Sequence, residues 1–319
     1  MKFISPSALQ KLGVLGMNAR NIDYISQYNE RRLYPLVDNK LKTKELAQEH
    51  GLRTPYLFAY IQYQAQIKTL KKLLPKEEGF VLKPAQGSGG KGILIITRQE
   101  KGEYFKANGE KIPYEELKRH ISNILSGLYS LGGKDDVALI ERVIEFDDAL
   151  EGFSYEGVPD IRVVVYRGYP VIAMMRLPTA LSDGKANLHQ GAVGVGVDIV
   201  TGKALCAVQF DRPITKHPDT DKRLDLLSVP YWDEILELAA GAYDMTNLGY
   251  LGADIILGKK NGPMLLELNA RPGLAIQIAN DIGLMKRLSK VDEVADEHLS
   301  VQERIEFSLE NFAQQGEME

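Results

Sequence analysis

Two groups of residues in this sequence have the side-chain types needed for phosphate and metal chemistry. The first is the glycine-rich stretch 87–92 (GSGGKG), which follows Lys83 on an apolar segment. The second is the acid pair Asp254 and Glu267, with Asn269 two residues further on. Backbone N–H groups of a glycine loop and a lysine bind phosphate oxygens, whereas carboxylate and amide oxygens suit Mg²⁺. The sequence therefore indicates a site for phosphate and a hard cation.

The glycine stretch matches the string G-x-G-x-x-G, but a β-branched segment follows it where a dinucleotide-binding loop opens a helix. A Walker loop is excluded because only two residues separate Gly87 from Gly90 and no Ser or Thr follows Lys91. Protein kinases are excluded because the strings H-R-D and D-F-G are absent. Two interpretations stay open, a glycine-rich hairpin over phosphates and a plain surface turn. Lys83 is correspondingly either a phosphate ligand or an exposed charge at a strand end.

The acids lie on two apolar segments that flank a turn and predict a β-hairpin. If Asn261 and Gly262 are the central turn residues, Asp254 pairs with Asn269, and Glu267 lies diagonally on the same face. If the turn lies one residue earlier, Glu267 becomes the neighbour of Asp254 on the partner strand. The two acids converge in either register and would repel each other without a cation. We therefore favour a metal site over a solvated hairpin face.

The composition limits the class of protein. A chain of 319 residues with 44% hydrophobic and 26% charged residues can form two or three packed lobes. A net charge of -4 argues against a nucleic-acid partner, and no run of about 18 apolar residues predicts a membrane span. The single cysteine, Cys206, excludes an internal disulfide and indicates a reducing, cytoplasmic setting. Its apolar neighbours predict a buried structural thiol.

The order of the segments resembles the ATP-grasp superfamily, and within it the RimK-like carboxylate–amine ligases. The stretch 38–55 is similar to the opening segment with the first phosphate-binding lysine, and 140–144 to the linker that holds adenine. Arg176 followed by 187–191 (NLHQG) is similar to the Arg…Asn-Leu-His-x-Gly segment of RimK-like enzymes. The stretch 17–35 resembles the lead-in of alpha-L-glutamate-ligase-like, or sugar-transfer-associated, ATP-grasp proteins.

The resemblance implies a set of site residues. Those expected to contact the phosphates, the ribose or the adenine of ATP are Lys40, Lys83, Gly87, Ser88, Gly89, Gly90, Glu141, Val143 and Asp160. Those expected near the reacting groups are Arg162, Arg176, Asn187 and Arg271. The expected metal ligands are Asp254, Glu267 and Asn269, for Mg²⁺ or alternatively Mn²⁺. For His189 we favour a hydrogen-bonded strand-end residue over a proton acceptor.

Strands and helices without strict alternation predict an α+β chain, and the resemblance implies the ATP-grasp fold, with two α+β lobes that grip ATP. We expect a short helical lead-in over residues 1–37 instead of a full N-terminal domain. The N-terminal lobe with the glycine loop would span 38–145, the C-terminal lobe with the hairpin 146–290, and a C-terminal helix 291–319.

The resemblance also implies an activity, the ADP-forming ligation of a carboxylate to an amine through an acylphosphate. Glutamate or another amino acid would be a substrate, and the partners would be small molecules or a peptide. Two alternatives are a ligase that modifies a protein tail and an ATP-binding regulatory protein without catalysis.

Overall fold

The computed structural model describes residues 5–87, 89–130, 132–294 and 298–313. The chain divides into two compact units, each with its own hydrophobic core. Unit 1 comprises Met1–Val37, Leu46–Arg53 and Glu145–Glu319, and unit 2 comprises Asp38–Glu45 and Thr54–Ile144. The lead-in and the C-terminal helices thus both belong to unit 1.

The lead-in of unit 1 is a series of short helical segments. They are α1 (Pro6–Lys11), α2 (Met17–Ala19), the π-helix η1 (Arg20–Ile25), α3 (Ser26–Tyr28), the 3₁₀-helix η2 (Arg31–Leu33) and α4 (Pro35–Asp38). The side chain of Ser5 caps α1 by accepting a hydrogen bond from the backbone N–H of Ala8 at 3.2 Å. The segments are too short to be stable alone, so they depend on packing against the rest of unit 1.

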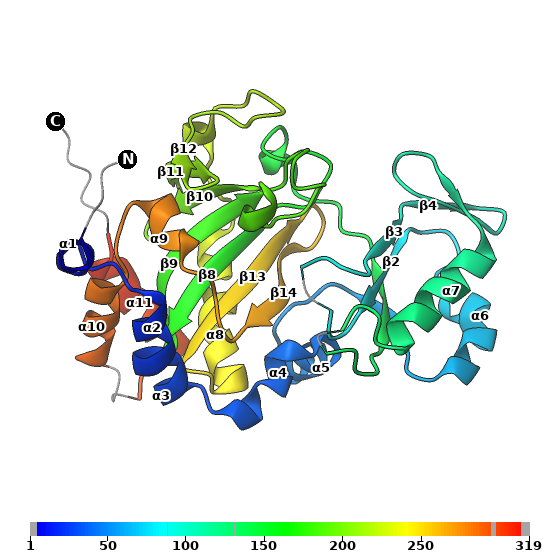
Figure 1. Ribbon diagram of the computed structural model, residues 1–319, viewed down its shortest axis with the longest axis horizontal. Coiled ribbons are helices and arrows are strands. Elements are labelled where there is room, and N and C mark those ends of the chain that lie inside the picture. Colours follow the sequence, from blue (N-terminus) through cyan, green and yellow to red (C-terminus); the bar gives the residue numbers. More distant parts are fainter. Residues whose placement is uncertain (1–4, 88, 131, 295–297, 314–319) are drawn as a thin grey trace. The chain divides into compact units, whose positions relative to one another are not determined.

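Unit 1 is built on a seven-stranded antiparallel sheet in the order β12-β11-β10-β9-β8-β13-β14 (Figure 1). Its strands are β8 (Asp160–Tyr166), β9 (Tyr169–Leu177), β10 (Val193–Val197), β11 (Ala204–Gln209), β12 (Arg212–Pro213), β13 (Tyr250–Gly258) and β14 (Gly262–Asn269). Short 3₁₀-helices lie in its connections, at η4 (Asp148–Leu150), η5 (Leu188–Gln190) and η6 (Leu224–Leu226).

Helices cover both faces of this sheet (Figure 1). On one face, α8 (Trp232–Thr246) lies along β8, β9, β13 and β14, and α11 (Val301–Asn311) packs against α8. On the other face, α9 (Ala275–Asn280) lies against β9, β10 and β11, and α10 (Met285–Asp292) follows it. A Cβ at Gly196 would lie 2.2 Å from the carbonyl oxygen of Ala279, so the glycine permits the close approach of α9.

At the acids, the hairpin β13–β14 has the pairing of the second predicted register, but its turn differs from both predictions: Gly258 pairs with Gly262, so three residues, 259–261, form the loop. Asp254 pairs with Glu267, and Gly252 pairs with Asn269. A β-bulge at Leu266 shifts the register, so Leu265 occupies the core position that alternation would give to Leu266. Leu266 is only half-buried, because the extra residue interrupts the alternation of the strand.

Unit 2 has a four-stranded antiparallel sheet in the order β1-β7-β2-β3 and a small sheet β4-β5-β6. The strands are β1 (Leu57–Ile61), β2 (Phe80–Pro84), β3 (Leu94–Ile96), β4 (Arg98–Glu100), β5 (Glu103–Phe105), β6 (Lys111–Ile112) and β7 (Ala138–Arg142). The helices are the first residues of α5 (Lys40–Glu49), together with η3 (Gln64–Thr69), α6 (Leu70–Leu73) and α7 (Tyr114–Leu125). The glycine stretch joins the antiparallel strands β2 and β3, as the hairpin interpretation predicts.

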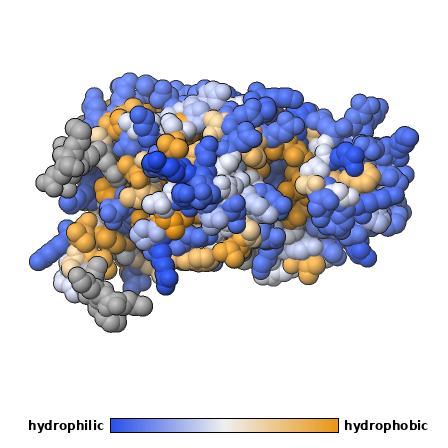
Figure 2. Space-filling model, turned by 90° about the horizontal axis from the view of Figure 1, so that it is seen from above, coloured by the Kyte–Doolittle hydropathy of each residue, from blue (hydrophilic) through white to orange (hydrophobic). Residues whose placement is uncertain are grey.

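The surface drawn in Figure 2 is mostly hydrophilic, with apolar side chains in several separate groups.

Cys206 on β11 is exposed, so the prediction of a buried thiol is wrong. In the part of the sheet that the structure describes, the two-residue strand β12 alone lies beyond β11 at this edge, so apolar sequence neighbours do not ensure burial. Among the described residues, none of the helices combines the length and the apolar character needed to cross a bilayer.

Candidate functional site

A row of charged side chains crosses one face of the unit 1 sheet. The register pairs Arg176 of β9 with Asp160 of β8, Arg162 of β8 with Asp254 of β13, and Asp254 with Glu267 of β14. Paired residues of antiparallel strands point to the same face, so all five side chains lie on one side. The sheet therefore brings together residues that are up to 107 positions apart in the sequence.

Hydrogen bonds between ions hold the row together. Arg162 Nε donates to Asp254 Oδ1 at 2.7 Å, and Arg176 Nη2 donates to Asp254 Oδ2 at 2.7 Å and to Asp160 Oδ2 at 2.6 Å. Burial by itself raises the pKa of Asp254, but Arg162 and Arg176 outweigh it and hold the pKa below its usual range. Burial raises the pKa of Asp160 to about 6, although Arg176 opposes the shift. Asp254 is therefore a buried anion between two cations.

The three predicted metal ligands lie at one end of the row. Glu267 is the register partner of Asp254, and Asn269 follows two residues later, so their side chains share a face. Asn269 Oδ1 accepts a hydrogen bond from the backbone N–H of Arg271 at 2.9 Å. Among the described residues, no group of three or more His, Cys, Asp and Glu side chains is placed to hold a metal ion. The predicted set, two carboxylates and an amide oxygen, fits Mg²⁺ by donor chemistry and register.

The remaining predicted residues of unit 1 lie in loops. Arg271 follows β14, and its guanidinium carbon lies 5.3 Å from the ring centroid of Tyr34. Asn187 caps η5, where its Oδ1 accepts a hydrogen bond from the backbone N–H of His189 at 3.1 Å. His189 is exposed in η5 rather than at a strand end.

In unit 2, Lys83 belongs to a buried cluster of three charges. Its Nζ lies 2.7 Å from Glu141 Oε2 on β7, and Lys44 Nζ lies 3.2 Å from Glu141 Oε1. Lys44 also donates a hydrogen bond to the carbonyl oxygen of Pro55 at 2.7 Å. Burial lowers the pKa of Lys44 to about 8, and the nearby Lys83 adds to the shift while Glu141 opposes it. Since Lys83 is 5% exposed, the interpretation as an exposed strand-end charge is wrong.

The start of the glycine stretch is anchored at two points. Lys40 Nζ donates a hydrogen bond to the carbonyl oxygen of Gly87 at 2.9 Å. The first predicted phosphate-binding lysine and the glycine stretch are therefore neighbours. Asp136 Oδ1 accepts a hydrogen bond from the backbone N–H of Gln86 at 3.0 Å, and Asp136 Oδ2 accepts one from Ser130 Oγ at 2.7 Å. The predicted contact Ser88 lies outside the described residues.

The end of the stretch packs against α7 and the turn after it. His120 forms a 2.9 Å hydrogen bond with the carbonyl oxygen of Gly92. A Cβ at Gly92 would lie 2.5 Å from the ring of Tyr129. Gly89, Gly90 and Gly92 all have positive φ, a conformation that side chains with a Cβ rarely adopt. The loop between β2 and β3 thus needs glycine for its backbone and for its packing.

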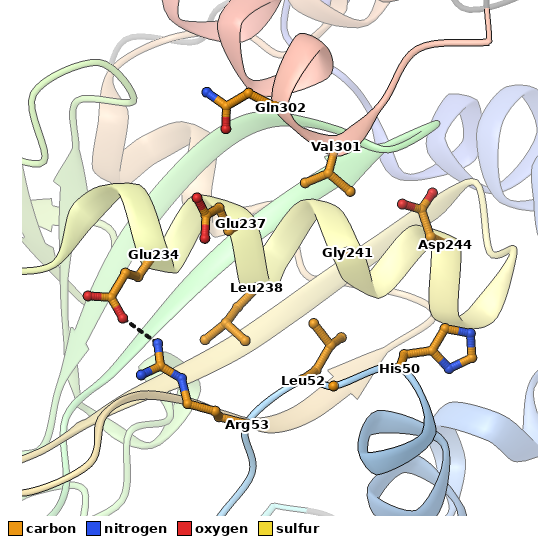
Figure 3. Close-up of a pocket in the computed structure, with 11 residues that line it drawn as sticks. His50, Leu52, Arg53, Glu234, Glu237, Leu238, Gly241, Asp244, Val301 and Gln302 are labelled. Atoms are coloured by element: carbon orange, nitrogen blue, oxygen red, sulfur yellow. Dashed lines mark hydrogen bonds and ion pairs between the residues drawn. The ribbon is translucent and has the colours of Figure 1, made fainter.

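A cavity of about 470 Å³ in unit 1 lies apart from the charged row (Figure 3). It is formed by α8, by the start of α11 and by residues 50–53, and Arg53 forms an ion pair with Glu234 there. Among the described residues that line it, none belongs to the predicted site. We therefore take two separate features as candidates for function: the charged row of unit 1 and, in unit 2, the cluster of Lys40, Lys44, Lys83 and Glu141 with the glycine stretch.

The structure also adds residues that the sequence interpretation did not include. Lys44 lies one helical turn after Lys40 on α5, and this spacing is the sequence signal that points to it. Asp136 and His120 reach the glycine stretch from segments that follow it by 28 to 50 residues. Such long-range contacts leave no local pattern in the sequence.

A family model described as sugar-transfer associated ATP-grasp matches residues 19–293. No curated protein matches the sequence. Solved structures similar to this chain include the ATP-grasp ligase PsnB complexed with a minimal precursor, with a TM-score of 0.46 and 14% identity over 85% of this chain and 63% of PsnB. The chain thus spans less than two thirds of the length of PsnB.

Two further structures illustrate the range of this similarity. The D-cycloserine synthetase DcsG has a TM-score of 0.47 and 13% identity over 88% of this chain and 78% of DcsG. A D-alanine–D-alanine ligase from Bacillus anthracis, complexed with ATP, has a TM-score of 0.45 and 15% identity over 86% of this chain and 69% of the ligase.

Proposed function

Because the chain belongs to the sugar-transfer-associated ATP-grasp family, we propose that it is an ATP-dependent carboxylate–amine ligase. The observation that carries the proposal is the charged row, in which Asp254 is held by Arg162 and Arg176 beside Glu267. This arrangement has carboxylate oxygens next to cations on one face of a sheet. Phosphoryl transfer needs both, because negative charge spreads over the transferring group.

Unit 2 would bind the phosphates of ATP. Lys83 and Lys40 supply cations, and the glycine stretch supplies backbone N–H groups. Glu141, which keeps Lys83 in place, and Val143 would contact the adenine. In unit 1, Asp160 would meet the ribose.

A divalent ion, Mg²⁺ or Mn²⁺, would polarise the phosphate oxygens when bound. Asp254, Glu267 and Asn269 would hold the ion, through two carboxylates and an amide oxygen on one face of the sheet. Arg176, Arg162 and Arg271 would place positive charge near the transferring phosphoryl group.

The proposed reaction has two steps. A substrate carboxylate oxygen attacks the γ-phosphorus, the bond to the β-phosphate oxygen breaks, and ADP leaves. An amine then attacks the carbonyl carbon of the acylphosphate, phosphate leaves, and the amine gives up a proton to form the amide. Asn187 would orient the reacting groups, and the glycine stretch would exclude water, which hydrolyses acylphosphates.

The substrates we propose are glutamate or another amino acid, with a small amine or a peptide as acceptor. The likeness of residues 176–191 to RimK-like ligases supports an acid–amino-acid reaction. A cytoplasmic setting, favoured by the single cysteine, suits a reaction that consumes ATP.

A hydroxylamine trap tests the proposal without knowledge of the natural amine. The protein is incubated with MgATP, hydroxylamine and a panel of carboxylates, and mass spectrometry detects hydroxamates while chromatography separates ADP from AMP. A hydroxamate formed together with ADP, and absent in Glu267→Gln, is the expected result. AMP as the nucleotide product would refute the ADP-forming mechanism.

A second outcome of the trap would favour one of the two alternatives, a ligase that modifies a protein tail or an ATP-binding protein without catalysis. Measurable binding of MgATP without any hydroxamate would contradict a small-molecule ligase. The same trap with peptides as carboxylates then separates a ligase for protein tails, which gives a peptide hydroxamate, from an ATP-binding protein without turnover, which gives none.

A further inference from the structure

The three residues that follow the metal-ligand candidate Asn269 are all held by the lead-in. Asn29 Nδ2 donates a hydrogen bond to the carbonyl oxygen of Ala270 at 3.0 Å. Arg20 Nη1 donates one to the carbonyl oxygen of Pro272 at 2.9 Å. Between them, the guanidinium group of Arg271 lies over the ring of Tyr34. Three lead-in side chains thus contact three consecutive residues.

Asn29 makes this connection rigid. Asn29 is 3% exposed, and besides Ala270 its side chain bonds to both backbone polar groups of Tyr250: Oδ1 accepts from the N–H at 2.8 Å and Nδ2 donates to the C=O at 2.6 Å. A single buried amide therefore joins the first residue of β13 to the residue after β14. Such fully used buried groups fix one geometry, since losing any bond leaves a polar atom unsatisfied.

Aromatic packing seats the lead-in on the face that carries the charged row. Tyr24 and Tyr28 each pack edge-to-face on Tyr166, with ring centroids 5.4 Å apart. Tyr166 pairs with Tyr250, and Tyr250 lies four residues before Asp254 on β13, so the rings share the face of Asp254. The lead-in therefore packs on the same face as the charged row, over the ends of β8 and β13 that carry Tyr166 and Tyr250.

We propose that residues 20–34 are a positioning element for Arg271. Arg20 and Asn29 fix the carbonyl groups on either side of Arg271, and the Tyr34 ring limits the directions that its guanidinium can take. The inference rests on the proposed function, in which Arg271 neutralises charge on the reacting groups. An arginine side chain free in solvent must be ordered before it can act, and a ring beneath it reduces that entropic cost.

The central test compares Tyr34→Leu with Tyr34→Phe. Leucine keeps an apolar side chain but removes the aromatic face, whereas phenylalanine keeps the face. We expect Tyr34→Leu to lower the rate of hydroxamate formation about tenfold at saturating MgATP, because misplacement of one reacting group costs rate rather than nucleotide binding. The dissociation constant for Mg-AMPPNP, measured by calorimetry, should change less than twofold, and Tyr34→Phe should retain the wild-type rate.

Equal rates for Tyr34→Leu and the wild type would overturn the positioning role of Tyr34. Equal losses in Tyr34→Leu and Tyr34→Phe would also overturn it, since the hydroxyl group and not the ring face would then be responsible. A parallel loss of Mg-AMPPNP affinity and rate would show a general structural defect instead.

A second measurement does not depend on activity. Hydrogen–deuterium exchange of peptides covering residues 269–274 should be faster in Arg20→Met, while exchange of β10 stays unchanged. Ile22→Ala is the matched control, because Ile22 lies on the same π-helix with an exposed side chain. If the wild-type protein forms no hydroxamate, the proposed function fails while this test still decides: unchanged exchange in Arg20→Met overturns the positioning element.

Discussion

Asp254 illustrates how a single buried acid depends on its neighbours. It is 0% exposed and accepts hydrogen bonds from two guanidinium groups, so its charge is balanced without a metal ion. Removing one partner of such a cluster leaves an uncompensated buried charge. The folded state then loses more stability than if all the charges of the cluster were replaced by apolar residues. The two arginines are therefore what keeps Asp254 ionised in the buried row.

Glu267 is the acid of this face that is not buried, so it is the better residue for testing metal binding. We expect Glu267→Gln to weaken Mn²⁺ binding in the presence of AMPPNP by at least about tenfold, because a neutral amide replaces a charged ligand. Electron paramagnetic resonance of Mn²⁺ measures this directly. Glu237→Gln, on the exposed side of α8, makes the same change away from the row and should bind as the wild type does. Equal affinity in both variants would refute the metal assignment.

Lys44 makes stability depend on pH. Its pKa is about 8 in the folded protein and near 10.5 when unfolded, so between these values the unfolded state binds more protons. Raising the pH through this window therefore stabilises the folded wild type relative to Lys44→Met. The unfolding free energy of the wild type minus that of Lys44→Met should increase by roughly 1 kcal/mol or more between about pH 8 and pH 10.

Urea denaturation of both proteins at several pH values measures this difference, in which titrating groups away from the cluster of Lys44, Lys83 and Glu141 cancel. A difference that stays flat, or that falls as pH rises, would show that Lys44 keeps an ordinary pKa.

The types of the site residues were predictable from the sequence, but their contacts were not. Asp254 and Glu267 could be recognised because two acids on a hairpin face need a cation. That the cations are Arg162 and Arg176 depends on the order of the strands, which brings β8 and β9 beside β13. The roles predicted for these residues toward ATP stay predictions.

At the scale of single elements, the glycine loop between β2 and β3 is restricted by what packs on it. Gly92 has a φ of +76° and its Cβ position lies against Tyr129, whereas Gly89 has a φ of +63° and open space around it. We expect Gly92→Ala to destabilise the protein by roughly 1–3 kcal/mol more than Gly89→Ala, because only the first adds a clash to the backbone strain. Chemical denaturation measures the difference, and equal losses would contradict the packing of Tyr129 on the loop.

The hairpin β13–β14 shows the limit of prediction for an element. Its existence and its acid face followed from two apolar segments around a glycine-containing turn. Two registers were open, and the strands pair at the acids as the second predicts, but a bulge at Leu266 separates these pairs from those next to the turn. The bulge brings Asp254 opposite Glu267, and no local residue preference announces it, so the turn residues alone do not predict the pairing of the acids.

At the scale of the whole molecule, the ATP-grasp α+β fold expected from the order of the motifs is confirmed by the family match over residues 19–293 and by the mixed helices and antiparallel sheets. The motifs were enough to predict the fold because each of them marks a different element of it. The assignment of the lead-in and of residues 46–53 to unit 1 depends on packing between distant segments.

The two separate cores predict that the units lose stability independently. Ile121 is fully buried in the core of unit 2, and Ile235 is fully buried in that of unit 1. Ile121→Ala should cost about 2–5 kcal/mol and accelerate hydrogen exchange in unit 2 alone, and Ile235→Ala should do the same in unit 1 alone. Peptide-resolved exchange measures both variants, and acceleration across the whole chain in either one would show a single cooperative unit.

The exposure of Cys206 has a practical consequence. It is the single cysteine of the sequence, so a maleimide dye would attach at one defined place on β11. Partial burial and the carboxylate of Asp281 raise the pKa of its thiol, so labelling proceeds faster under mildly alkaline conditions. A second cysteine in place of the exposed Leu128 of unit 2 would complete a donor–acceptor pair for single-molecule fluorescence. Leu128→Cys is thus the one substitution needed to follow the two units in real time while ATP is added.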